Sequence, residues 1–144
     1  MDTDDPFEIT DFLPYLLNRA AEESSLGFQA HYRERHGMLR TEWRVLFHLG
    51  RYGALTAREI CDRARIHKTK VSRAVAALED KRFLSRTEDA ADRRREPLVL
   101  TRAGVRVYAE LAEEARRYDA RLAERFSAAE VRTLRECLRR LAVA

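Results

Sequence analysis

The sequence predicts a mainly α-helical protein with one small β-ribbon. Apolar residues recur at three- and four-residue spacings along most of the chain, which is typical of amphipathic helices. Gly and Pro are scarce, at 5 and 3 of 144 residues, whereas an all-β domain needs many turns. The spacing of the apolar residues departs from this helical pattern only between residues 83 and 100. A chain of 144 residues is long enough for one core, so we expect a single domain over residues 1–144.

The first helix is expected between Thr10 and about His36. Thr10 is a suitable N-cap, and Pro14 falls in the first turn, where a missing N–H costs little. Gly37 is expected to end the helix. Its apolar stripe consists of Phe12, Leu13, Leu16, Leu17 and Ala20.

Three shorter helices are expected next. The first of them begins after its cap Thr41 and ends at Gly53. Thr56 and Glu59 have the spacing of a capping box, which opens a second short helix. A tight connection over 65–67 leads into the third, over about 68–81. The apolar residues of the first two are Trp43, Leu46, Phe47, Leu49, Ile60 and Ala64.

Two short strands are expected at 83–87 and 97–100, joined by a charged loop over 88–96. Pro97 has no N–H to donate to a neighbouring strand, so its strand is not expected to be a central one. A two-stranded ribbon with a long charged tip fits this pattern.

Two helices are expected to complete the chain. Thr101 caps the first, and Ser127 with Glu130 forms a capping box that opens the second. Together with residues 10–36, they carry more apolar surface than the central lobe can cover, so we expect a second copy of the chain to cover it. Their apolar stripes are Val105, Tyr108, Leu111, Ala115, Tyr118 and Leu122, then Val131, Leu134, Leu138 and Leu141.

The positive charge is concentrated in the middle of the chain. The net charge of the whole chain is +4, but residues 63–82 carry seven basic and two acidic side chains, whereas residues 1–30 carry one basic and seven acidic ones. A basic cluster on one element is typical of nucleic-acid binding. A solvated helix face is the alternative interpretation.

The helix over 68–81 separates into two faces when it is projected at 100° per residue. Val71, Ala74, Val75 and Leu78 share one face, while Thr69, Arg73 and Ala76 point the opposite way with Lys70 and Ser72 beside them. Long donors near the start and small residues in the middle suit a major groove.

A short helix, a tight turn, a basic helix and a charged ribbon form the layout of a winged helix-turn-helix, which we place at 39–103. The charged loop would be its wing. Three successive arginines in that loop cannot all pack under the ribbon, so some are expected to reach the adjacent minor groove. Asp92 is expected to pair with an arginine and fix the angle of the ribbon. The residues expected to contact DNA are Thr56, His67, Lys68, Thr69, Lys70, Ser72, Arg73, Arg86, Arg93, Arg94 and Arg95.

Four segments of the chain resemble the MarR family of regulators. Asp92 and Arg94 occupy the Asp-x-Arg positions of the family's wing, whereas His67 stands where its recognition helix usually starts with Asp. The segments are 39–46, 55–60, 70–79 and 89–104. The resemblance implies a homodimeric repressor or activator in which residues 10–36 and 104–144 interlock. It also implies a double-stranded DNA partner with a pseudo-palindromic operator, and a small aromatic or phenolic effector.

An effector site is expected where the first and second helices meet. Tyr15, Arg19, Trp43, Arg44 and Phe47 would combine an aromatic wall with a guanidinium, which suits an aromatic carboxylate. The alternative is that Trp43 and Phe47 are simple core residues.

Other classes of function have weaker support in the sequence. No catalytic motif occurs, so no enzyme, catalytic residue or cofactor is expected. His31 and His36 would lie about 140° apart on a helix, which disfavours a shared metal site. Cys61 lies among arginines and leaves a redox-sensing regulator open, while Cys137 is expected to be an inert core residue.

A winged helix used as a protein-binding adaptor is a further alternative. No apolar run reaches the length of a membrane helix, and the acidic residues 1–5 do not begin a signal peptide. A cytoplasmic protein without a membrane partner is the expectation.

Overall fold

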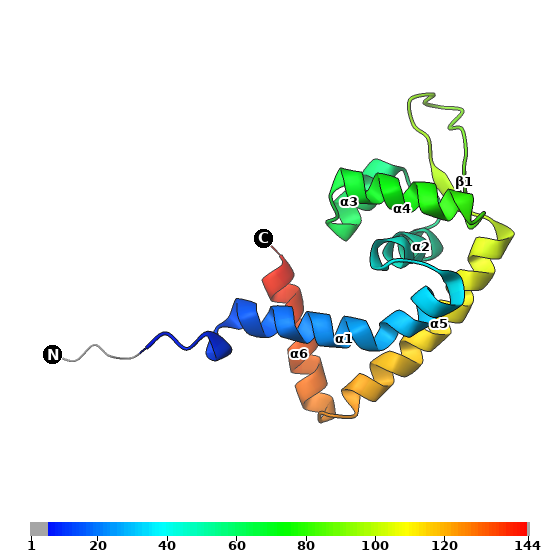
Figure 1. Ribbon diagram of the computed structural model, residues 1–144. Coiled ribbons are helices and arrows are strands. Elements are labelled where there is room, and N and C mark those ends of the chain that lie inside the picture. The colour runs from blue at the N-terminus through cyan, green and yellow to red at the C-terminus, as the bar shows by residue number, and fades with distance from the viewer. Residues whose placement is uncertain (1–5, 144) are drawn as a thin grey trace. The chain divides into compact units, whose positions relative to one another are not determined.

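The structure, a computed structural model, describes residues 6–143 and is mainly helical with one two-stranded sheet (Figure 1). This confirms the predicted fold class. Residues 1–5, where no signal peptide is expected, lie outside the described range. The elements are η1 (Ile9–Asp11), α1 (Leu13–His36), α2 (Arg40–Tyr52), α3 (Ala57–Ala64), α4 (Lys68–Asp80), β1 (Leu84–Arg86), β2 (Leu98–Leu100), α5 (Arg102–Ala123) and α6 (Ala128–Ala142).

The chain divides into two compact units, Met1–Arg40 and Thr41–Ala144. In the first unit, the prediction that Thr10 caps the long helix is wrong. Glu8 caps a short 3₁₀ turn instead, because its carboxylate accepts from the Thr10 backbone N–H at 3.3 Å and from the Thr10 hydroxyl at 2.8 Å. These bonds lower the pKa of Glu8. The extended residue Phe12 then starts α1, and Pro14 lies in the first turn as predicted.

The end of α1 follows the prediction. Gly37 adopts φ 62°, a left-handed conformation that favours glycine, and its N–H bonds to the Arg33 carbonyl. Phe28, Tyr32 and Met38 are buried. Apolar side chains near the start of the unit are exposed, namely Phe7, Ile9, Phe12, Leu13 and Leu16.

α2 begins at Arg40, two residues earlier than predicted. Thr41 therefore lies inside the helix and does not cap it. Val45, Leu46 and Leu49 are buried, and Gly53 follows the helix with φ 78°.

α3 and α4 form the helix-turn-helix pair and pack against each other. Thr56 caps α3, and the left-handed residue Arg65 ends it. The buried residues of α3 are Ile60 and Ala64, and those of α4 are Val71, Ala74, Val75 and Leu78, as predicted. α4 also packs against β1, so its outer face is set by contacts on two sides.

The strands pair antiparallel, with Leu84 opposite Leu100 and Arg86 opposite Leu98. The sheet has only two strands, so β2 is not a central strand, as predicted. Leu98 also pairs with Leu55 on its other side, through N···O bonds of 2.7 and 3.2 Å. Pro97 stands one residue before β2, and its carbonyl accepts from the Thr87 N–H at 2.8 Å.

α5 and α6 begin with the predicted caps. Thr101 accepts from the Gly104 N–H at 3.0 Å, and Ser127 forms a reciprocal capping box with Glu130. The apolar stripe of α5 differs from the prediction, because Val107 is buried while Val105 is exposed. Gly104 lies so close to the Phe83 carbonyl that a Cβ would collide with it, which brings the start of α5 against the ribbon.

The stripe of α6 remains largely uncovered. Leu134, Leu138 and Leu141 are 45%, 42% and 58% exposed, although they recur at helical spacing on one side of the helix. Asp119 of α5 joins α6 through an ion pair of 2.6 Å to Arg135. Among the described residues, no helix is apolar and long enough to cross a bilayer.

Candidate functional site

The outer face of α4 presents polar and small side chains to solvent. Thr69, Ser72, Arg73 and Ala76 are exposed, together with Lys70. The opposite face is fully occupied by core residues, so the helix cannot rotate about its axis without burying charge. The side chains that the projection placed on the outer face are therefore the ones that face solvent.

His67 provides the N-cap of α4. Its Nδ1 accepts from the Thr69 N–H at 3.2 Å, so the imidazole takes the place of the aspartate that the resemblance led us to expect. An accepting Nδ1 is unprotonated, which places the proton of the neutral ring on Nε2. His67 is exposed at the same end of the helix as Lys68 and Lys70.

The wing is a loop between β1 and β2 that extends beyond the strands (Figure 1). Two aspartates shape it: Asp89 accepts from the Ala91 N–H at 2.9 Å, and Asp92 accepts from the Arg94 N–H at 3.0 Å. The prediction that Asp92 pairs with an arginine side chain is wrong, because its carboxylate bonds to the backbone two residues on. Asp92 therefore orients the turn that carries Arg93 and Arg94, both of which are exposed.

Two of the predicted DNA contacts, Arg86 and Arg95, are instead held by carboxylates. Arg86 bonds to Glu79 at 3.1 Å and to Glu96 at 3.4 Å. Arg95 bonds to Glu59 through Nε at 3.1 Å and through Nη2, and to Asp89 through Nη1 at 3.2 Å. A guanidinium with two carboxylate partners brings little net positive charge to a phosphate, so we no longer expect these two arginines to contact DNA.

Sequence reasoning missed the carboxylate partners of these arginines. The sequence indicated Glu59 only as half of a capping box. In the structure, the Thr56 hydroxyl accepts from the Glu59 N–H at 3.1 Å, as in such a box. The Glu59 carboxylate, however, binds Arg95. Thirty-six positions separate Glu59 from Arg95, so no local pattern reveals the pair.

The expected effector residues fall into both units. In the first unit, Arg19 donates to the Tyr15 hydroxyl at 3.5 Å, which raises the pKa of Arg19. In the second, Trp43 and Phe47 are half-buried and meet edge to face, with ring centroids 4.9 Å apart. Phe47 in turn meets Tyr108 at 5.2 Å, which extends the aromatic wall to α5.

Arg44 has a structural contact of its own. Its Nη2 donates to the Ala64 carbonyl at 3.0 Å, at the last residue of α3. Its side chain therefore connects α2 to the helix-turn-helix pair by a hydrogen bond that the sequence did not indicate.

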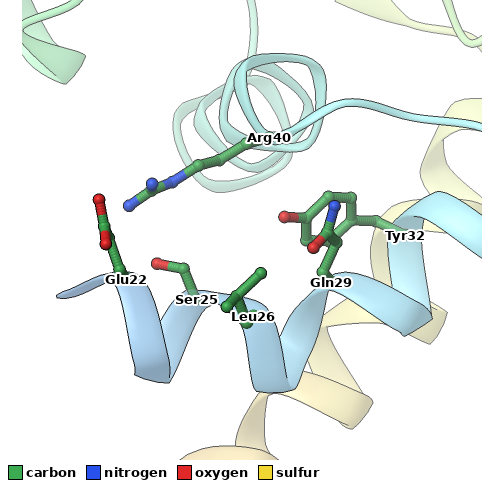
Figure 2. Close-up of a pocket in the computed structure, with 6 residues that line it drawn as sticks. All are labelled: Glu22, Ser25, Leu26, Gln29, Tyr32 and Arg40. Carbon is green, nitrogen blue, oxygen red and sulfur yellow. The ribbon is translucent and has the colours of Figure 1, made fainter. Parts of the chain in front are cut away.

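A hollow of 310 Å³ lies in the first unit, and Figure 2 shows Arg40 extending toward Glu22. None of the five expected effector residues lines it. Its lining residues are Glu22, Ser25, Leu26, Gln29, Tyr32 and Arg40.

The two cysteines differ from expectation in one respect. Cys61, in α3, is half-buried. Cys137 is half-buried as well, so the prediction that it is a core residue is wrong. Its Sγ lies 3.8 Å from Nη2 of Arg140, three residues further along α6. Within residues 6–143, no group of three or more His, Cys, Asp or Glu side chains is arranged to hold a metal ion.

Comparisons with known proteins agree with this geometry. A family model described as MarR family matches residues 36–95. The chain is similar to a MarR/EmrR family transcriptional regulator from Acinetobacter sp. ADP1, with 27% identity, a TM-score of 0.84, and coverage of 93% of this chain and 94% of that one. It is also similar to a MarR family transcriptional regulator from Silicibacter pomeroyi, with 29% identity, a TM-score of 0.78, and coverage of 96% and 93%.

A third structure shares the fold at lower identity. BpsR of Bordetella bronchiseptica, whose DNA binding is regulated by 6-hydroxynicotinic acid, has 21% identity, a TM-score of 0.85, and coverage of 96% of this chain and 99% of its own. Among curated proteins, none matches the chain.

The cap of α4 yields a prediction about stability. Replacing His67 by Ala removes the acceptor of the Thr69 N–H, so the free energy of unfolding should fall by about 0.5–2 kcal/mol. His67→Asp restores an acceptor at the positive end of the helix and should be at least as stable as the parent chain. Urea unfolding measures both. Lys68→Ala, one position along and exposed, is the control, and equal loss in His67→Ala and Lys68→Ala would contradict the cap.

Proposed function

Because the chain belongs to the MarR family, we propose that it is a homodimeric transcriptional regulator that binds a pseudo-palindromic site in double-stranded DNA and is released by a small aromatic acid. The observation that carries the proposal is the two-sided character of α4. One face is buried in the core, and the other presents Thr69, Ser72 and Arg73 to solvent.

The exposed face of α4 has the dimensions and donors that a major groove requires. Arg73 carries a planar fork that fits the two acceptors of a guanine edge, while Ala76 leaves room where the helix lies close to the bases. His67, Lys68 and Lys70 cluster at the start of the helix, where phosphates are favoured by both charge and helix dipole. Thr56, the N-cap of α3, carries a hydroxyl that can donate to a phosphate of the DNA backbone.

Arg93 and Arg94 supply a second contact at the tip of the wing. Both are exposed, and the Asp92 turn precedes them. Positive side chains on a projecting ribbon suit the negative potential of a narrow minor groove. The wing would thus add phosphate and groove contacts beside the bases that α4 reads.

The exposed apolar side chains support a dimer. Leu134, Leu138 and Leu141 form one uncovered stripe, and Phe7, Phe12 and Leu16 add more apolar surface at the other end of the chain. A second copy related by a two-fold axis would cover such surfaces and present two α4 helices to half-sites about one helical turn apart.

Aromatic and cationic side chains support an aromatic acid as effector. In the second unit, Trp43, Phe47 and Tyr108 form a continuous aromatic wall that suits the ring of such an acid. In the first unit, Arg19 is exposed and carries a charge that suits a carboxylate. BpsR, a relative in fold, responds to an aromatic acid. A ligand changes DNA affinity only by as much as it prefers one conformation of the dimer over another.

The first prediction from the proposed function separates contacts to bases from contacts to phosphates. In duplexes selected from a random library, Arg73→Ala should weaken binding by about 1–3 kcal/mol and relax preference at one base position. Arg94→Ala should weaken binding to all sequences evenly, and it should reduce the slope of log affinity against log salt concentration by about one unit. Arg106→Ala, exposed on α5, is the control. Unchanged selectivity in Arg73→Ala would show that α4 does not read bases.

The second prediction concerns assembly. Sedimentation at micromolar concentration should give a dimer, and Leu138→Asp should shift it toward monomer because a carboxylate would be buried in an apolar interface. Arg132→Ala, exposed on the same helix, should leave the dimer intact. A monomeric parent chain would overturn the homodimer.

The third prediction concerns the effector. A hydroxylated aromatic carboxylate should weaken operator binding about 5–150-fold without dissociating the dimer, and operator should weaken its binding by the same factor. Arg19→Ala should abolish the response and leave DNA binding unchanged, with Arg33→Ala as control. Arg44→Ala is less informative because it also removes the bond to α3.

Two results would redirect the proposal. If a broad panel of aromatic acids leaves operator affinity unchanged, the effector class is wrong. If mild peroxide releases DNA and Cys61→Ser prevents it, the chain is a redox sensor.

A further inference from the structure

Arg95 joins two segments of the second unit that are distant in sequence. Its Nε and Nη2 donate to the Glu59 carboxylate on α3, and its Nη1 donates to the Asp89 carboxylate in the wing. One planar guanidinium therefore bonds to two carboxylates at once, a geometry that lysine cannot reproduce. We call Arg95, Glu59 and Asp89 the Arg95 clamp.

Both carboxylates of the clamp are held in place by further bonds. Glu59 lies in the first turn of α3, where its own N–H donates to the capping hydroxyl of Thr56. The other oxygen of Asp89 accepts from the Ala91 N–H. Bonds from Ala91 and Arg95 lower the pKa of Asp89, so this carboxylate stays charged and the pair persists at neutral pH.

The wing needs such a tether. Between β1 and β2 it runs from Thr87 to Pro97 without strand pairing beyond the bond from Thr87 to Pro97, and a loop of this length populates many conformations unless its side chains restrain it. The Arg95 clamp restrains it at a point directly after Arg93 and Arg94. A restrained loop loses less conformational freedom on binding.

We propose that Arg95 is a positioning residue, which clamps the wing to α3 so that Arg93 and Arg94 are held ready for DNA, and that it does not itself bind DNA. The proposal rests on the proposed function for its consequence, but the clamp itself is a property of the free protein.

The decisive variant is Glu59→Gln, because two effects oppose each other in it. Removal of a negative charge near DNA by itself strengthens binding. Loss of the clamp weakens it, and we expect a net weakening of about three- to tenfold. Glu88→Gln, which removes the same charge from an exposed position of the wing, is the matched control and should bind as well as the parent chain or better.

Two further variants test the geometry of the clamp. Arg95→Lys keeps the charge but loses the fork, and should weaken binding as Glu59→Gln does. The exchange Glu59→Arg with Arg95→Glu restores opposite charges and should recover part of the affinity lost in either single variant.

A measurement without DNA separates the clamp from the proposed function. Trypsin cleavage after Arg93 or Arg94 should be about tenfold faster in Glu59→Gln than in Glu88→Gln, at an unchanged midpoint of thermal unfolding. If Glu59→Gln unfolds at a lower temperature, Asp89→Asn tests the same clamp from the wing side.

The outcomes are distinct. Faster cleavage with weaker operator binding supports the proposal in full. Faster cleavage in a chain that binds no duplex DNA at all retains the clamp and overturns the proposed function. Unchanged cleavage, or an operator affinity in Glu59→Gln equal to or above that of Glu88→Gln, overturns the positioning role of Arg95.

Discussion

The burial of one face of α4 is the constraint on which the rest of the second unit depends. Val71, Ala74, Val75 and Leu78 are withdrawn from water between α3 and β1, and no rotation of the helix preserves that burial. The side chains opposite, Thr69 and Arg73 among them, must face outward. Fold stability and the direction of the candidate DNA-reading face are thus two consequences of the same packing.

Charge is distributed so that only some arginines keep a strong positive field. Arg86 and Arg95 are neutralised by carboxylates from other segments, whereas Arg73, Arg93 and Arg94 are exposed. Exposed ion pairs contribute little to stability, so the carboxylates around Arg95 matter more for where the wing lies than for how firmly the protein folds. A count of basic residues alone overstates the number available to phosphate.

The chain also leaves apolar surface that its own described residues do not cover. The stripe of α6 is amphipathic, yet Leu134, Leu138 and Leu141 remain about half-exposed. Cys137 lies beside this stripe and is half-buried for the same reason. A partner surface would convert α6 from an exposed amphipathic helix into a buried one, which is the physical basis of the proposed dimer.

The sequence by itself determined what depends on neighbours within about four residues. Helical periodicity, the caps at Thr56, Thr101 and Ser127, and the two faces of α4 are of this kind, because backbone bonds and helix faces repeat over one turn. Tertiary structure decided the pairing of Arg95 with Glu59 and that of Leu98 with Leu55, since these partners lie more than thirty positions apart. Only the folded chain brings such residues together, so charge type alone could not separate an exposed arginine such as Arg94 from one that bonds to carboxylates, such as Arg95.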